Sequence, residues 1–474
     1  MLLLRGVRGG ARAATRRRAR PAWGGDGVSV LCRRPLCSSQ ASDARVDAVT
    51  RGDEVEDNGR DGGGIVVVGV ETSCDDTGVG VLRVRQRSCR AAKKTGVGIE
   101  AEVLANVVSS QFEIHREYGG IVPRLAARAH EANLPLVVEQ ALEQAKLSWK
   151  EVDAIAVTTG PGLSPCLWAG IRAAEDYAAQ HAVPVVAVNH LEGHALIPRL
   201  FEDSPAAFPF LTLIASGGHT LLVHVNGVRD YTLVAQSLDD AIGECFDKVA
   251  RVMGCDGSVS GHPGKEVERL AAQGNPEAIP FRVPLTRSHN VRSCDFSFSG
   301  LKSAVRRYVG QRNAEPLSAA EMADVAAGFQ HAALTHLENS TRRALVFSGC
   351  RMEPAHLEKV DVSMRRKYNK DVARMPDEPL SARPPRSLVV SGGVASNAAL
   401  RQRLERLANC FGIPLHVPPP RLCTDNGVMI AWAGAELVAA GPGRTLADLR
   451  SHADTLAALP RWPLNTMSSV HAST

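Results

Sequence analysis

Two histidines stand four residues apart in the stretch NHLEGHALIPRL, which runs from Asn189 to Leu200 and follows the apolar segment VPVVAV. If this stretch is helical, the imidazoles of His190 and His194 lie on one face and can share a metal ion. A metalloprotease of the His-Glu-x-x-His type needs its general-base glutamate directly after the first histidine, where this chain has Leu191. The spacing therefore permits a metal site and disfavours a protease. A purely structural helix start after a strand remains the alternative.

The chain contains three turn motifs rich in small residues. The first lies in IVVVGVETSCDDTGVGVLRV and the second in FLTLIASGGHTLLVHV, and each has apolar runs on both sides, which is typical of a β-hairpin. The third, in SLVVSGGVASNAALRQRL, predicts a strand, a turn and a helix that begins near Ser396 or Asn397. One such turn is usually only a tight turn. Three in one chain favour a nucleotide cleft, because exposed backbone amides and helix N-termini bind phosphate.

The two hairpins suggest a duplicated α/β domain, and the segments between them alternate strand-like and helix-like patterns, as in VDAIAVTTGPGLS, CLWAGIRAAEDYAAQHA and VPVVAVNH. We expect a first lobe over residues 64–200, a second lobe over 201–450 and a C-terminal tail over 451–474. Residues 349–386 are charged, contain prolines and show little apolar periodicity. We therefore expect them to form a disordered surface insertion in the second lobe.

Charge is concentrated at the N-terminus. The chain of 474 residues carries a formal charge of +5, while its first 40 residues carry +8, from nine arginines and one acid, Asp26. An arginine-rich, acid-poor leader is typical of an organellar transit peptide, and a basic arm that binds nucleic acid is the alternative. Residues 41–63 are polar and predict a flexible linker. Because the rest of the chain carries −3, any binding of nucleic acid depends on a local patch of cations.

Other features of composition exclude whole classes of protein. No apolar run approaches the roughly 20 residues that span a bilayer, so we expect no association with a membrane. The 11 cysteines include no C-x-x-C pair, which favours reduced thiols over a disulfide framework or a zinc knuckle. We expect Cys74 and Cys423 to be packing residues rather than nucleophiles.

Eight motifs follow one another along the chain: VETSCDDTGVGV, GPGLS, NHLEGH, ASGGHT, DDAIGECFDKVAR, FSFSGLKSAV, SGGVASN and CTDNGVMIAW. Through them the sequence closely resembles the universal tRNA threonylcarbamoyladenosine synthase family, above all its mitochondrial members, once described as O-sialoglycoprotein endopeptidase-like. The resemblance covers about residues 65–450. It implies the duplicated α/β fold of actin, Hsp70 and sugar kinases, with a cleft between two lobes.

The resemblance also implies roles for individual residues. His190, His194 and Asp425 would hold one divalent metal ion per subunit, and two imidazoles with a carboxylate suit zinc or iron. Asp75, in the first hairpin, is the candidate catalytic residue. The pocket for an adenylate substrate would be lined by Ile214, Ala215, Ser216, Gly217, Gly218, Asp247, Gly264 and Asn397. One departure from the family pattern is Pro263, where a second glycine is usual before the helix.

The activity implied is transfer of a threonylcarbamoyl group from threonylcarbamoyl-adenylate to N6 of adenosine 37 of tRNAs that read codons beginning with A, with release of AMP. We expect a mitochondrial acyltransferase, a separate synthase that supplies the adenylate, and a homodimer. The candidate tRNA-binding cations are Arg199, Lys302, Arg306 and Arg307. The rival interpretations are an ATP-dependent kinase of the same fold, a metalloprotease, and an interaction protein without catalysis.

Overall fold

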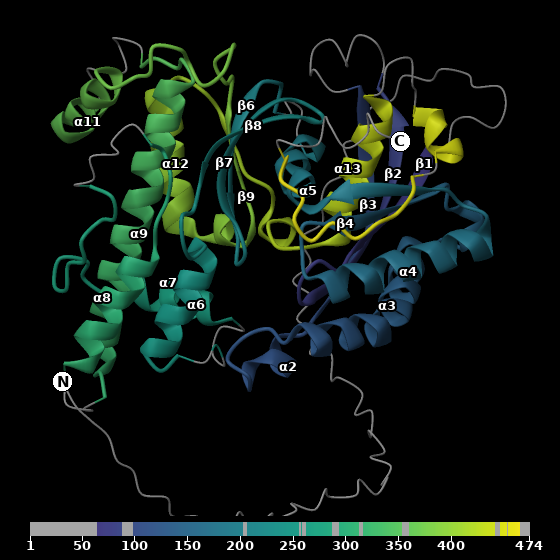
Figure 1. The fold of residues 1–474 in the computed structure, drawn as a ribbon, viewed down its shortest axis with the longest axis horizontal. Helices are drawn as coiled ribbons and strands as arrows, with labels where there is room; N and C mark the ends of the chain where they lie inside the picture. The colour runs from purple at the N-terminus through teal and green to yellow at the C-terminus, as the bar shows by residue number, and fades with distance from the viewer. Residues whose placement is uncertain are drawn as a thin grey trace, which may run out of the picture. The chain divides into compact units, whose positions relative to one another are not determined.

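Two five-stranded sheets with matching topology form the framework of the protein in the computed structural model (Figure 1). The structure describes residues 64–87, 98–201, 206–255, 257, 262–286, 293–311, 316–352, 360–440, 446–452 and 454–464. All of them belong to one unit, Gly59–Thr474. The predicted transit peptide over residues 1–40 and the predicted linker over 41–63 lie outside the described residues.

The first sheet has the strand order β3-β2-β1-β4-β5. Strands β1, β2 and β3 are antiparallel neighbours, whereas β4 and β5 run parallel to β1. Branched apolar residues such as those of IVVVGVE are buried along the whole of β1, as expected for a central strand covered on both faces. The bounds are β1 Ile65–Glu71, β2 Asp76–Gln86, β3 Ile99–Ser110, β4 Ala154–Gly160 and β5 Val185–Asn189.

The second sheet repeats this arrangement, with the order β8-β7-β6-β9-β10. Again the first hairpin continues into an antiparallel third strand, and the last two strands run parallel to the first. The duplicated α/β fold expected from the sequence is therefore confirmed. The bounds are β6 Phe210–Ala215, β7 Thr220–Gly227, β8 Asp230–Gln236, β9 Leu388–Ser391 and β10 Leu415–His416.

Helices cover both sheets. Helices α3 and α4 pack on one face of the first sheet, and α6, α7, α8, α9 and α12 share one apolar core with the second. The bounds are α2 Phe112–Arg116, α3 Pro123–Ala145, α4 Ser164–His181, α5 His190–Leu196, α6 Ile242–Val252, α7 Pro263–Ala271, α8 Ser299–Gly310, α9 Ala319–Phe347, α11 Val362–Val372, α12 Ala398–Cys410 and α13 Gly427–Ala439. None of the helices within these described ranges is both long and apolar enough to cross a membrane.

Short 3-10 turns join several of these elements, namely η1 Trp149–Glu151, η2 Ile197–Leu200, η3 Gly393–Ser396, η4 Pro420–Leu422 and η5 Leu446–Ser451. Helix α5 follows β5 without a gap and contacts β5 of the first sheet as well as β6 and β9 of the second. The histidine pair is therefore held where the two halves of the fold meet.

Helix α13 lies directly on the backbone of the first hairpin. A Cβ atom added to Gly80 would lie 2.3 Å from the backbone nitrogen of Val428, and one added to Gly427 would lie 2.1 Å from that of Gly80. Only glycine permits so close an approach of a helix to a strand. The N-cap residue of α13, Asn426, accepts a hydrogen bond from Met429 N, so the preceding Asp425 is fixed next to the hairpin.

This contact corrects the expected division of the chain. The sequence predicts that the second lobe includes all of residues 201–450, but α13 packs against the first sheet through an apolar core that includes Val428 and Trp432. The chain thus returns to its first half after β10. The expected tail also contributes to the core, because Trp462 is buried and its carbonyl accepts a hydrogen bond from the Asn189 side chain at 3.0 Å.

The expectation of a disordered insertion over residues 349–386 is wrong for its central part. Residues 362–372 form helix α11, and the side chain of Asp361 caps its N-terminus by accepting a hydrogen bond from Met364 N at 2.8 Å. Sequence periodicity missed the helix because only Tyr368 and Asp371 are buried on it. Residues 353–359 of the insertion lie outside the described residues.

Candidate metal centre

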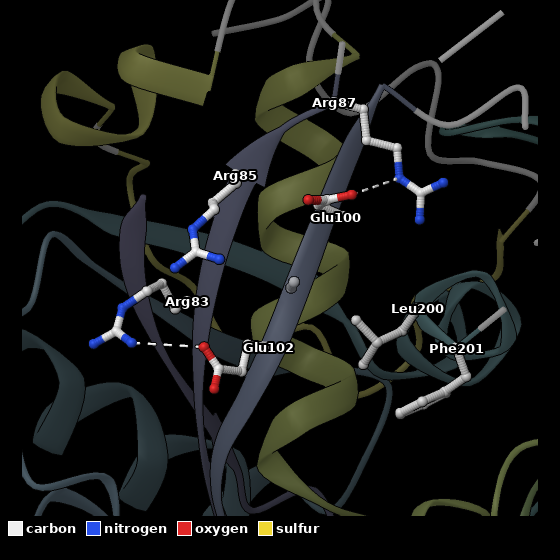
Figure 2. A pocket seen from close by; sticks show the side chains of 8 residues that line it. Arg83, Arg85, Arg87, Glu100, Glu102, Leu200 and Phe201 are labelled. Atoms are coloured by element: carbon white, nitrogen blue, oxygen red, sulfur yellow. Dashed lines mark ion pairs between the residues drawn. The ribbon is translucent and has the colours of Figure 1, made fainter. Parts of the chain in front are cut away.

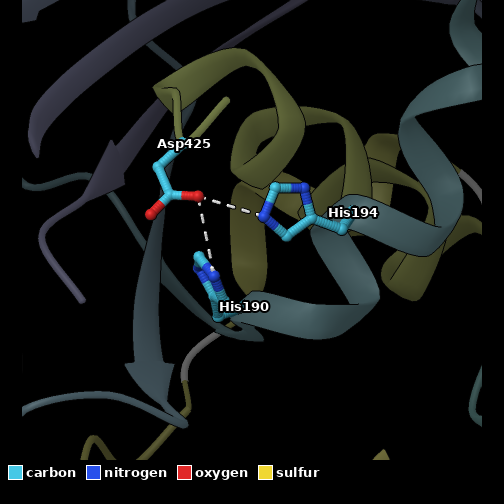
Figure 3. Close-up of side chains that lie close together, drawn as sticks. All are labelled: His190, His194 and Asp425. Carbon is cyan, nitrogen blue, oxygen red and sulfur yellow. Dashed lines mark hydrogen bonds and ion pairs between the residues drawn. The ribbon is translucent and has the colours of Figure 1, made fainter. Parts of the chain in front are cut away.

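His190, His194 and Asp425, the trio implied by the family resemblance, converge on one point (Figure 3). Nε2 of His194 lies 3.1 Å from Oδ1 of Asp425, and Nε2 of His190 lies 3.8 Å from the same oxygen. One donor atom from each residue lies within 4.8 Å of the other two. Both histidines are buried, whereas the Asp425 side chain is partly exposed. Asp425 is therefore the member of the trio that solvent reaches most.

The helix start positions the two rings. The side chain of Asn189 caps α5 by accepting hydrogen bonds from Leu191 N and Glu192 N at 2.9 and 3.3 Å. Because α5 starts at His190, the two histidines lie one turn apart, and their ring centroids are 4.8 Å apart. The cap residue and the first ligand candidate are consecutive, so the end of β5 fixes both.

Glu71 orients the first ring from behind. Its Oε2 accepts a hydrogen bond from His190 Nδ1 at 3.0 Å and another from Thr158 Oγ1 at 2.6 Å. A proton on Nδ1 leaves Nε2 as a lone-pair donor that faces Asp425. Glu71 is a site residue that the sequence motifs do not single out. The signal available was a single acid at the end of an otherwise apolar strand.

The charges around the trio favour a bound cation. Burial would lower the pKa of His190, but the negative charges of Glu71 and Asp425 outweigh it and raise the pKa to about 9. Burial would likewise raise the pKa of Asp425, and the neighbouring His190 and His194 lower it instead. Two imidazole nitrogens and a carboxylate oxygen are ligands that zinc and ferrous iron accept. The residues present thus fit a divalent transition-metal ion.

Asp75 and Asp76, in the turn of the first hairpin, lie near Asp425 of the trio. Burial, followed by the charge of Asp425, raises the pKa of Asp75, and burial with the charge of Asp75 raises that of Asp76 to about 7. Burial also raises the pKa of the Cys74 thiol well above its usual range and that of Cys423 to about 11. Neither thiol is an activated nucleophile, which agrees with the packing role expected for both.

The predicted adenylate residues occupy two kinds of position. Ile214 and Ala215 are buried in β6, while Gly217 and Gly218 form the turn to β7, where an added Cβ atom would meet nothing within 4 Å. Ser216 precedes them, and its carbonyl accepts a hydrogen bond from Gly243 N of α6 at 3.1 Å. The glycine turn therefore presents open backbone and joins α6.

The structure also brings Asp247 and Gly264 together. Gly264 N donates to Oδ1 of Asp247 at 3.0 Å, which ties α7 to α6. Pro263, the departure from the family pattern, occupies the first turn of α7, where its missing N–H costs nothing. Asn397 caps α12 by accepting from Leu400 N and donates to Gln330 Oε1 at 2.8 Å. Part of its hydrogen-bonding capacity is thus already used.

The prediction that Arg199 binds tRNA is wrong. Arg199 is buried, its Nε donates to Oε1 of Glu436 at 2.9 Å, and its guanidinium lies 3.8 Å from the ring centroid of Phe208. A side chain held in this way cannot meet a phosphate. Lys302 pairs with Asp240 at 2.5 Å and is partly exposed, whereas Arg306 and Arg307 are exposed on α8.

A pocket of about 490 Å³ lies elsewhere on the first lobe, along strands β2 and β3 (Figure 2). Two of its arginines are paired with acids of β3, Arg83 with Glu102 at 3.6 Å and Arg87 with Glu100 at 3.4 Å. It contains none of the predicted catalytic, metal or adenylate residues. It also lies toward the end of β2 away from the acidic turn. We therefore do not assign the reaction to it.

Comparison with known proteins agrees with this geometry. Residues 102–432 match the family described as tRNA N6-adenosine threonylcarbamoyltransferase. A relative from Novosphingobium aromaticivorans with that name is 40% identical over 403 residues, which cover 84% of this chain and 96% of the relative. An Arabidopsis thaliana relative, named a probable mitochondrial tRNA N6-adenosine threonylcarbamoyltransferase, is 38% identical over 419 residues, covering 84% of this chain and 75% of the relative.

Among solved structures, the Clostridium difficile activator of 2-hydroxyisocaproyl-CoA dehydratase with bound ADPNP aligns at 12% identity and a TM-score of 0.38, covering 79% of this chain and 93% of the activator. These values are too low to bear on function. The sequence relatives are much closer and span most of the chain. On their evidence, the chain belongs to the tRNA N6-adenosine threonylcarbamoyltransferase family.

Proposed function

We propose that this protein transfers the threonylcarbamoyl group of threonylcarbamoyl-adenylate to N6 of adenosine 37 in tRNAs that read codons beginning with A. A bond forms between N6 and the carbamoyl carbon, the bond from that carbon to the phosphate oxygen of AMP breaks, and N6 loses a proton. The observation that carries the proposal is the convergence of His190, His194 and Asp425 in a member of this family.

The reaction depends chiefly on alignment. The lone pair of N6 is delocalised into the purine ring, so the amine is a poor nucleophile. Holding both reactants in contact lowers the barrier by roughly 7 to 11 kcal/mol in favourable cases. The open backbone at Gly217 and Gly218 suits the approach of the adenylate, and the carboxylate of Asp247 suits its ribose hydroxyls.

The polar residues of the site would stabilise developing charge, orient His190 and remove the proton from N6. His190, His194 and Asp425 would hold a zinc or iron ion, which when bound supplies Lewis-acid stabilisation of the negative charge that develops on the adenylate oxygens. Glu71 keeps His190 in the tautomer that points Nε2 at this position. Asp75, in the turn beside the trio, is our candidate for the carboxylate that assists proton removal from N6.

We also propose a mitochondrial location, a separate source of the adenylate, a homodimer and cationic contacts to the tRNA. The arginine-rich residues 1–40 support delivery to mitochondria, as does the name of the Arabidopsis relative. The adenylate would come from a separate synthase, and we propose a homodimer. Arg306 and Arg307, exposed on α8, would contact the tRNA backbone, with Lys302 as a weaker candidate because Asp240 already pairs with it.

One panel of assays tests the function. The purified chain is incubated with threonylcarbamoyl-adenylate and unmodified tRNA, then with ATP and sugars, and then with casein. We expect modified adenosine in the first assay alone. Phosphorylated sugar or cleaved casein, with no modified adenosine, would replace the transferase by the kinase or the protease.

A further inference from the structure

Helix α11 presents a basic face that the proposed reaction does not use. Arg366 and Lys370 are one turn apart on it, and both are exposed. Neither pairs with an acid among the residues that the structure describes. A shallow pocket of about 460 Å³ follows the same face and is lined by Val362, Arg365, Arg366, Asn369, Lys370 and Ala373.

The one acidic residue within α11, Asp371, points into the protein, away from the basic face. Asp371 is buried, and its Oδ2 accepts a hydrogen bond from Nε of Arg342 on α9 at 2.8 Å. Both side chains of this pair are less than a tenth exposed. Because the one carboxylate within α11 is turned inward, Arg366 and Lys370 have no counter-charge between Val362 and Val372.

Buried contacts fix the helix in place. Tyr368 is buried, its hydroxyl accepts a hydrogen bond from Met352 N at 3.2 Å, and its ring meets that of Phe411 edge-on. Together with the ion pair to Arg342, these contacts set which side of α11 faces outward. A basic face held in this way is a preorganised surface and needs little ordering when a partner binds.

Its charge spacing fits a phosphate backbone. Residues at i and i+4 of a helix are about 6 Å apart along the axis, which is similar to the separation of successive phosphates on one nucleic-acid strand. The chain beyond its first 40 residues carries a net charge of −3, so the exposed cations Arg366 and Lys370 stand out against the rest of the protein.

We propose that the exposed face of α11 binds the phosphodiester backbone of the substrate tRNA, outside the nucleotide that is modified. This inference rests on the proposed function, because tRNA is the polyanion that the reaction requires. α8 and α11 both pack on α9: Phe298, the N-cap residue of α8, contacts His336, and Asp371 of α11 pairs with Arg342 (Figure 1). Cations on the two helices would therefore extend one binding surface along α9.

An anionic membrane is the other partner that a basic helix can have. Membrane-surface helices bury a broad apolar face that carries large side chains. On α11 the large apolar and aromatic side chains, Met364 and Tyr368, pack inward, and Val362 is the chief apolar side chain exposed near the cations. The observations therefore favour RNA.

The test compares two double variants that change charge equally. Arg366→Glu with Lys370→Glu reverses the face of α11, and Lys150→Glu with Arg172→Glu reverses two exposed cations of the first lobe. Binding of an unmodified tRNA transcript to the full chain is measured from 50 to 200 mM salt. Transfer from threonylcarbamoyl-adenylate and binding to phosphatidylcholine vesicles with phosphatidylglycerol are measured in parallel.

We expect the α11 variant to bind tRNA at least about tenfold more weakly at low salt and to lose about two units of the slope of log affinity against log salt. Its affinity for the adenylate should remain that of the wild type, and so should the control variant's tRNA binding. Equal losses in both variants would mean a general charge effect and overturn the proposal, as would unchanged tRNA binding with lost vesicle binding. Absence of transfer by the wild type, with tRNA binding still dependent on α11, would instead reject the proposed function alone.

Discussion

The carboxylate of Glu71 lies 3.0 Å from Nδ1 of His190, while Nε2 of the same ring faces Asp425. One side of the ring is thus held by a buried acid at the end of β1, and the other side is presented to the candidate metal position. Carboxylates behind metal-binding histidines fix both the tautomer and the ring orientation. Glu71 is therefore a positioning residue for the trio.

Replacing Glu71 tests this role. Glu71→Gln keeps the size of the side chain but removes the charge, so we expect zinc affinity to fall by about 10- to 100-fold. Affinity is measured by competition with a chromogenic chelator, and the free energy of unfolding of the metal-free protein is measured beside it. Thr158→Val, which removes only the neighbouring hydroxyl, is the milder control. Wild-type metal affinity in Glu71→Gln would contradict the assignment.

The buried pair of Arg199 and Glu436 predicts a loss of stability rather than of tRNA binding. Glu436→Ala leaves the guanidinium buried without its partner, which costs about 3 to 5 kcal/mol. Unfolding in urea measures the loss. The double variant Arg199→Met with Glu436→Leu should recover most of it, because apolar replacement removes both charges. Weaker tRNA binding by this double variant, with restored stability, would return Arg199 to the tRNA surface.

Substitution by alanine should lower stability at Gly80 but not at Gly218. In Gly80→Ala the new Cβ atom meets the backbone of α13, so we expect the free energy of unfolding to fall by more than about 3 kcal/mol. Gly218→Ala meets nothing and should keep wild-type stability. Because its methyl group enters the open turn, adenylate binding should weaken. Calorimetry of thermal unfolding and of adenylate binding separates the two effects, and wild-type stability of Gly80→Ala would refute the close packing.

The exposed arginines of α8 supply a prediction about tRNA. Arg306→Glu with Arg307→Glu should weaken tRNA binding and flatten its salt dependence, because each phosphate contact contributes to the salt slope. Adenylate affinity serves as the control, since neither residue belongs to the predicted pocket. Filter binding across a salt series gives both quantities for tRNA. A salt slope equal to that of the wild type would exclude these arginines.

Local features of the site were predictable from the sequence, and contacts between distant segments were not. His190 and His194 could be paired because one helical turn separates them. Asp425 lies 231 residues beyond His194, so only the resemblance to a known family connected them. Glu71 was missed because an acid at a strand end is ordinary until the register of β1 beside β4 places Thr158 and His190 around it.

Two predictions about charged residues are wrong, those for Arg199 and for the residues of α11. Arg199 was predicted to be a surface cation, yet Glu436, which is 237 residues away, pairs with it inside the protein. The residues of α11 were predicted to be disordered because their apolar periodicity is weak, but a buried ion pair and one tyrosine anchor the helix. Both side chains, Arg199 and Asp371, are buried because a residue far away in the sequence pairs with them, and the local sequence pattern gives no sign of that residue.

Metal-dependent transfer is tested by measuring modified adenosine and AMP after incubation of the purified protein with threonylcarbamoyl-adenylate and an unmodified tRNA that reads a codon beginning with A. We expect wild-type protein to form one threonylcarbamoyl-adenosine at position 37 for each AMP released, and Asp425→Ala to fold normally yet lose at least about 100-fold in rate, as expected when a group that positions or stabilises charge is removed. Wild-type protein that forms no modified adenosine would rule out the transferase activity, and a metal-free Asp425→Ala protein that retains the full rate would rule out a role for the metal site in it.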